Sequence, residues 1–238
     1  MIEVKDFCKI YKSRFNEFCI KNVNFSVNSG EIVGLVGPNG SGKSTVMKAI
    51  CGFHYANKGN IFISDINNVK YNILEHPEKS MELCGYVPEI SYLPSNIKVL
   101  DFLIYAGKEH NLSDEELKKS LNKVIKDFSL SDFLENKIKN LSKGQQQRVS
   151  FAQALIHNPQ NLILDEPISG LDPSQIISLR KYIKSLSKNK AILISTHILN
   201  EVSSLCDKAF IMNQGTLWSV NNLNDIENEF IKITEVKK

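Results

Sequence analysis

Residues 32–45, IVGLVGPNGSGKST, constrain this chain most, because an apolar strand passes there through a glycine-rich loop into a helix. Gly37, Gly42, Lys43 and Ser44 match the spacing G-x-x-x-x-G-K-[ST] of a phosphate-binding P-loop. Glycines let backbone N–H groups approach phosphate oxygens, and a helix N-terminus adds only about 0.3–1 kcal/mol per charge, so several donors must act together. The pattern predicts a nucleoside triphosphate site in which Lys43 reaches the β- and γ-phosphates and Ser44 ligates Mg²⁺.

The composition indicates an ordinary globular chain of 238 residues that is 42% hydrophobic and can bury a core. The formal net charge of +3 is too small, and the lysines too scattered, to indicate a nucleic-acid partner. The five cysteines lack C-x-x-C spacing, so neither zinc nor a disulfide framework is predicted, and a reducing compartment fits them. We expect no signal peptide and no direct membrane span, because no apolar run approaches about 20 residues.

The hydrophobic pattern predicts an α/β fold with a mostly parallel core sheet and an N-terminal antiparallel β part. Alternating segments 1–10 and 18–27 are typical of antiparallel strands, and we expect short strands at 61–64 and 84–87. Continuous apolar segments predict buried strands at 32–37, 161–164 and 191–195, with a helix at 173–186 between the last two, so the crossovers should be right-handed. A terminal hairpin is predicted at 210–212 and 216–220, in which Trp218 should pack on the core. A final helix should follow within 221–238. The pattern between 65 and 80 is uninformative.

Residues 93–159 differ in kind and predict a helical subdomain inserted between the core segments 1–92 and 160–238 of a single domain. Val99, Phe102 and Leu103 recur at helical spacing. Ser113 and Glu116 then form a capping-box pattern, worth about 1 kcal/mol, which marks the start of a second helix.

Two adjacent carboxylates, Asp165 and Glu166, follow the predicted strand 161–164. One carboxylate suits Mg²⁺, and strand alternation should direct its neighbour the other way, free to polarise a water for attack on the γ-phosphate. Paired acids after a strand are also common as solvated loop residues. The upstream P-loop favours the catalytic interpretation.

His197 follows the predicted strand 191–195, at the sheet edge where open α/β folds bind ligands. A lone histidine is usually structural, but this position favours a hydrogen bond to the γ-phosphate. Leu141 is followed by small or polar residues, 142–147, ahead of a helix predicted at 148–156, where Ser142 could simply be a helix cap.

In this order the motifs resemble those of the nucleotide-binding subunits of ATP-binding cassette (ABC) transporters, over nearly the full length. Residues 141–145 resemble the signature sequence LSGGQ, except at Lys143. Residues 169–172 resemble the D-loop, which ends at Asp172, and His197 resembles the switch histidine. Tyr11 resembles the aromatic residue that stacks on adenine. Where most members carry a glutamine in the lid between sheet and helical subdomain, this chain has Glu89. The resemblance implies that this glutamate also ligates Mg²⁺, either directly or through water.

The resemblance implies an ATPase that uses ATP and Mg²⁺, works as a homodimer or paired cassette with ATP between two copies, and drives a separate integral membrane permease from the inner face of the cell membrane. Glu166, His197 and Lys43 would be catalytic, and Ser44, Glu89 and Asp165 would hold the metal. The nucleotide-binding set would be Tyr11, Gly37, Pro38, Asn39, Gly40, Ser41, Gly42, Lys43, Ser44, Thr45, Ser142, Gly144, Gln145 and Asp172.

The Glu89 lid, the Ser-Gly-Leu-Asp D-loop and Lys143 resemble exporter-type cassettes, so export is favoured over import. The main alternative is a soluble ABC ATPase acting on nucleic acid or ribosomes, although the tandem copies or long coiled-coil insertions typical of that class are missing from this sequence. A P-loop GTPase is disfavoured because no Asn-Lys-x-Asp motif occurs.

Overall fold

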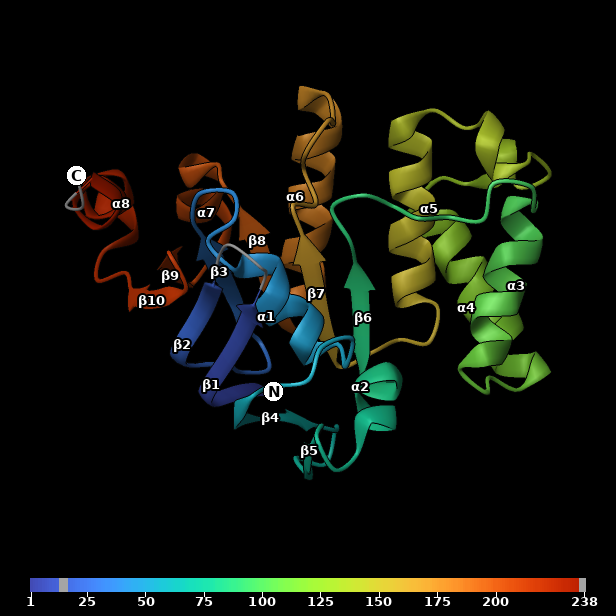
Figure 1. The fold of residues 1–238 in the computed structure, drawn as a ribbon. Helices are drawn as coiled ribbons and strands as arrows, with labels where there is room; N and C mark the ends of the chain where they lie inside the picture. The colour runs from blue at the N-terminus through green and yellow to red at the C-terminus, as the bar shows by residue number, and fades with distance from the viewer. Residues whose placement is uncertain (13–16, 236–238) are drawn as a thin grey trace.

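The larger of two β-sheets carries the P-loop strand at its centre, in a computed structural model that describes residues 1–12 and 17–235 (Figure 1). Its strands lie in the order β10 (Thr216–Ser219), β9 (Lys208–Asn213), β3 (Ile32–Val36), β8 (Ala191–Thr196), β7 (Asn161–Asp165) and β6 (Cys84–Val87). All neighbours are parallel except β10, which pairs antiparallel with β9. The predicted mostly parallel core sheet is confirmed.

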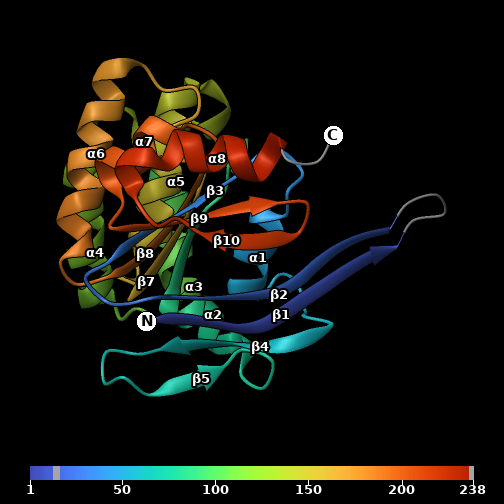
Figure 2. The same cartoon turned by 90° about the vertical axis from the view of Figure 1, so that its left-hand side faces the viewer.

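The second sheet is antiparallel and lies beneath the first, with β1 and β2 forming a long arm in Figure 2. Its order is β2 (Glu17–Val27), β1 (Ile2–Lys12), β4 (Lys58–Ser64) and β5 (Lys70–Asn72). Strand β5 and helix α2 (Pro77–Leu83) fall where the sequence pattern was uninformative. A three-residue edge strand and a seven-residue helix are too short to show a period.

Alternate residues of the buried strands pack on opposite faces of the larger sheet, as strand geometry requires. Val33 and Leu35 pack with helix α1 (Lys43–Ile50) and the antiparallel sheet. Leu162 and Leu164 pack on the other face, with helix α5 (Lys143–Leu155). Each such side chain contributes about 1.5–3 kcal/mol when fully buried, so both faces anchor the strands that carry the site.

The helical segment contains α3 (Val99–Glu109), α4 (Asp114–Asp127), the 3-10 turns η1 (Ser131–Phe133) and η2 (Ile138–Asn140), and α5. Ser113 caps α4 in the predicted capping box with Glu116. Buried residues of this segment, including Phe151, form one cluster with Leu162 and other residues of the sheet. The segment therefore has no core separate from the sheet, and the boundary at residues 93 and 159 stays a prediction.

The helix predicted at 148–156 corresponds to α5, and its predicted start was wrong by five residues, because α5 begins at Lys143. The run of three glutamines that forms its first turns hides the apolar period, and the capping box at Ser142 decides the start.

The C-terminal part contains α6 (Pro173–Ser187), α7 (Leu199–Leu205), η3 (Leu223–Asp225) and α8 (Ile226–Glu235). The final helix thus lies inside the predicted range 221–238, of which 236–238 lie outside the described residues. Trp218 is a strand residue, as expected, but does not pack in the core: it is 38% exposed, because β10 is the edge strand of its sheet. Within residues 1–12 and 17–235, none of the helices combines the length and apolar character needed to cross a membrane.

Candidate functional site

Residues 37–42 join β3 to α1, and two positions in this loop require glycine. Gly42 precedes the first residue of α1 with φ at 112°, a conformation that side chains rarely adopt. At Gly37 the backbone passes so close to Met212 that a Cβ would lie 2.1 Å from the Met212 carbonyl oxygen. These two glycines of the predicted P-loop therefore determine how the backbone turns from β3 into α1.

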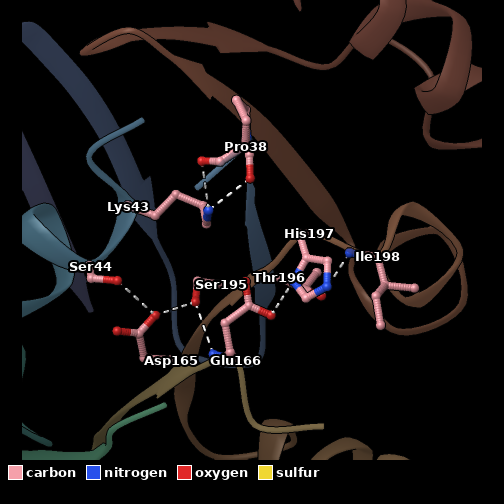
Figure 3. Close-up of polar contacts among 10 residues, drawn as sticks. Pro38, Lys43, Ser44, Asp165, Glu166, Ser195, Thr196, His197 and Ile198 are labelled. Carbon is pink, nitrogen blue, oxygen red and sulfur yellow. Dashed lines mark hydrogen bonds and ion pairs between the residues drawn. The ribbon is translucent and has the colours of Figure 1, made fainter. Parts of the chain in front are cut away.

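Lys43 is 6% exposed and donates hydrogen bonds to the carbonyl oxygens of Gly37 (2.7 Å) and Pro38 (3.2 Å). Figure 3 shows the ammonium of Lys43 beside Pro38. Burial lowers the pKa of Lys43, and the negative charges of Glu166, Asp165 and Glu89 oppose that shift. A buried ammonium thus faces three carboxylates. Because its hydrogen bonds go to neutral carbonyl oxygens, the ammonium can exchange them for the oxygens of an anionic ligand, and a cation would be needed to offset the repulsion between that ligand and the carboxylates.

The loop also keeps a polar atom without a partner. The hydroxyl of Ser41 is buried and has no hydrogen-bond partner among the described residues. Buried hydroxyls are rarely left unpaired, so this one is suited to a ligand oxygen. Pro38, Asn39 and Gly40 are exposed around the rim of the loop, and Thr45 is half-buried in α1.

Asp165 is 2% exposed at the end of β7 and collects three hydroxyl donors. Ser44 Oγ lies 3.3 Å and Ser195 Oγ 2.5 Å from its Oδ1, and Tyr86 Oη lies 3.4 Å from its Oδ2. Burial is the main reason that the pKa of Tyr86 is raised, and the charge of Asp165 adds to it. The structure therefore places Ser44 beside Asp165, as predicted for two ligands of one metal.

Glu166 is 8% exposed, and its Oε2 lies 2.9 Å from Nδ1 of His197. Its Oε1 is buried without a partner among the described residues. The expectation that strand alternation alone directs this side chain was wrong: β7 ends at Asp165, and Glu166 has a left-handed backbone with φ at 48°. That conformation is costly for glutamate and must be held by its surroundings.

Ser195 holds the Glu166 backbone and was missed by sequence reasoning. The Glu166 amide donates to the Ser195 hydroxyl (3.0 Å) and to the Ser195 carbonyl (3.2 Å), while the same hydroxyl donates to Asp165. The available signal was a serine at the polar end of an otherwise apolar strand. Its partners depend on the register of β7 and β8, in which Asp165 lies opposite Ser195.

Ser142 and Asp172 begin two neighbouring helices at the same end of the molecule as the C-terminal ends of β7 and β8 (Figure 1). Ser142 is exposed and caps α5: its hydroxyl accepts from the amide of Gln145 (3.3 Å), whose side chain accepts from the Ser142 amide (2.8 Å). Asp172 caps α6, and its hydrogen bonds with Ser174 and Gln175 lower its pKa. Gly144 lies against the Gln175 amide, which a Cβ would approach to 3.1 Å.

The remaining two predicted residues lie at the margins. Tyr11 is 38% exposed near the end of β1, where His54 meets its ring edge-on at 6.3 Å and the Lys9 ammonium lies 5.6 Å from the ring centre. Glu89 is exposed just after β6, and its charge partly opposes the lowering of the Lys43 pKa, so it acts on the P-loop without being buried beside it.

Comparison with known proteins identifies the family of this chain. The "ABC transporter" family profile matches residues 20–169. The chain is 31% identical to an uncharacterized ABC transporter ATP-binding protein, YxlF of Bacillus subtilis, over 96% of this chain and 73% of that protein. It is 32% identical to the lipopolysaccharide export system ATP-binding protein LptB of Escherichia coli K12, over 91% of this chain and 88% of LptB.

A dimeric post-hydrolysis structure of the ATP-binding cassette MJ0796 with ADP and Pi superposes with a TM-score of 0.81, at 26% identity, covering 93% of this chain and 100% of the cassette. Sequence and fold thus agree, and the chain belongs to the ABC transporter family, as an ATP-binding subunit with ATPase activity.

Proposed function

We propose that this chain binds ATP and Mg²⁺ at the P-loop, hydrolyses ATP between two cassettes, and powers a separate membrane permease, with export as the direction. The observation that carries the proposal is the convergence of Lys43, Asp165, Glu166 and His197 at one sheet edge. Export is supported by the likeness to LptB, an export-system subunit, at 32% identity.

The donor set near Ser44 fits Mg²⁺. The Ser44 hydroxyl and the Asp165 carboxylate, 3.3 Å apart, are hard oxygen ligands of the kind this ion prefers. Glu89 would complete the set from the rim, directly or through water. When bound, the ion neutralises charge on the transferring phosphoryl group.

Each side chain of the site would have its own role in phosphoryl transfer. Lys43 would exchange its bonds to the Gly37 and Pro38 carbonyls for phosphate oxygens. The free Oε1 of Glu166 would accept a proton from the attacking water, while His197 holds Oε2 and reaches the γ-phosphate. The Ser41 hydroxyl and the N–H groups of the loop would bind the remaining oxygens.

We propose that a second cassette completes the site. Ser142, Gly144, Gln145 and Asp172 lie at two helix starts, and an exposed helix N-terminus with a serine hydroxyl is suited to the γ-phosphate of a facing copy. The dimeric MJ0796 cassettes support this arrangement. Tyr11 would stack on adenine, supported from behind by His54 and Lys9.

The permease would dock in a groove of about 710 Å³ lined by Phe53, Met81, Glu89 and Tyr92, among others. Phe53, Met81 and Tyr92 are 63%, 69% and 87% exposed, an unusual concentration of uncovered apolar area. Docking there would hold the cassette at the inner face of the cell membrane.

Two experiments test the proposal. Lys43→Ala should weaken ATP binding by about 10- to 100-fold in calorimetry, because charged hydrogen bonds are worth about 1.5–3 kcal/mol. Lys181→Ala, at an exposed site on α6, should bind as the wild type does. Equal affinities would contradict the P-loop assignment.

The second experiment isolates the tagged chain from native membranes. A polytopic membrane protein should co-purify with the wild type and with Tyr105→Glu, an exposed site outside the groove, but not with Tyr92→Glu. If RNA or DNA co-purified with a salt-sensitive affinity and no membrane protein did, the result would support the nucleic-acid alternative instead.

A further inference from the structure

The side chain of Gln147, half-buried on α5, joins two segments that are far apart in sequence. Its Oε1 accepts a hydrogen bond from Ser91 Oγ at 3.4 Å, and its Nε2 donates to the carbonyl oxygen of Pro167 at 3.3 Å. One planar amide group therefore contacts both segments. A shift of either segment changes the geometry of the other bond.

The first segment is the loop that runs from β6 to α3 and passes α5 in Figure 1. Ser91 lies two residues after Glu89, between Ile90 and Tyr92, which are 61% and 87% exposed. All of these residues line the same groove. The segment held by Gln147 therefore forms part of the wall of this groove.

The second segment is the backbone that follows Glu166. The amide of Glu166 is held by Ser195, and the carbonyl of the next residue, Pro167, is held by Gln147. Glu166 itself is in the left-handed region with φ at 48°, so it needs support on both sides. We expect loss of either contact to let the backbone relax and to move the carboxylate away from its place beside His197.

We propose that Gln147 is a positioning residue that couples the loop carrying Glu89 to the catalytic placement of Glu166. Through Pro167 it holds the backbone that follows Glu166, and through Ser91 that support depends on the position of the loop. This inference rests on the proposed catalytic role of Glu166.

The test compares steady-state ATPase kinetics of the full chain and its variants. Gln147→Glu keeps an acceptor for Ser91 but cannot donate to Pro167, and it should lower kcat about tenfold with the KM for ATP within about twofold. Ser91→Ala breaks only the other contact and should lower kcat about threefold. In the double variant kcat should fall no further than in Gln147→Glu alone, because the two contacts act in series.

The matched control is Gln146→Glu. Gln146 is the neighbouring residue, and its Nε2 donates to the carbonyls of Ile138 and Leu141, so the same kind of bond is lost elsewhere. Its kcat should stay within about twofold of the wild type. An unchanged kcat for Gln147→Glu, an equal loss for Gln146→Glu, or losses that multiply to about thirtyfold in the double variant would each overturn the proposal.

Hydrogen exchange of residues 88–98 provides a readout that a purely structural role would not change. In a Glu166→Gln background, ATP should alter exchange of this loop in the control variant but not with Gln147→Glu. Persistence of the nucleotide response with Gln147→Glu would contradict the coupling. If Glu166→Gln alone turned over ATP normally, the proposed catalytic role would fail instead, so the two failures are distinguishable.

Discussion

Nδ1 of His197 lies 2.9 Å from Oε2 of Glu166, while Oε1 of the same carboxylate has no partner within residues 1–12 and 17–235. The histidine fixes the orientation of the carboxylate and leaves Oε1 available for a further hydrogen bond. Strands β7 and β8 are neighbours in the sheet, and their register brings Glu166 and His197 together although the two residues are 31 positions apart in the sequence.

Glu166→Gln should lower kcat for ATP hydrolysis by about 100-fold or more, because the amide cannot accept the proton of the attacking water. The Kd for ATP should stay within about threefold, since Lys43 and the loop are untouched. Steady-state kinetics with calorimetry checks both values. Glu227→Gln, at an exposed site on α8, is the control, and full activity in Glu166→Gln would remove this residue from the role.

Ser142→Ala and Ser113→Ala remove two equivalent capping boxes and form a matched pair. Each should lower the free energy of unfolding by about 1 kcal/mol in urea titrations. Only Ser142→Ala should also weaken ATP-dependent dimerisation, by roughly tenfold in sedimentation velocity, because only Ser142 would meet a facing nucleotide. Equal dimerisation of the two variants would argue against the paired site.

Ser195→Ala should lower the free energy of unfolding by about 1–3 kcal/mol, because the buried Asp165 carboxylate loses a donor. It should also lower kcat, since the Glu166 amide loses the Ser195 hydroxyl. Ser195→Thr keeps a hydroxyl and should recover part of both losses. Thermal unfolding and ATPase assays measure them, and a stable, fully active alanine variant would show that this hydroxyl positions nothing.

Acid pH should destabilise the fold through His157, which stacks on His110 at 3.6 Å. Burial lowers the pKa of His157 from 6.5 to about 3, so the folded state keeps it neutral while the unfolded state takes up a proton below about pH 6.5. Stability should therefore fall as the pH drops from 6.5 towards 3, by up to about 2 kcal/mol at pH 5.

Urea unfolding at pH 7 and pH 5 measures this dependence. His157→Phe keeps an aromatic ring for the stack and should flatten the pH dependence. His76→Phe, at an exposed histidine, should retain it. A wild-type slope in His157→Phe would assign the acid sensitivity to other groups.

Short-range features of this protein could be predicted from the chain alone. The P-loop, the buried strands and the Ser113 cap each depend on residues within a few positions of one another, so spacing and period identify them. The same logic failed for the start of α5, because the capping geometry at Ser142 outweighs a polar run that shows no apolar face.

Only the tertiary structure decided how the site is held. The Ser195 hydroxyl, which contacts Glu166 and Asp165, and the Gln147 amide, which contacts Pro167 and Ser91, join residues from 20 to 56 positions apart. The left-handed backbone of Glu166 depends on these contacts, and no local pattern predicts them. These contacts follow from strand register and helix packing, which place side chains to within a hydrogen-bond length. The sequence determined which chemical groups reach the sheet edge, and the packing of the sheet against α5 determined which of them touch.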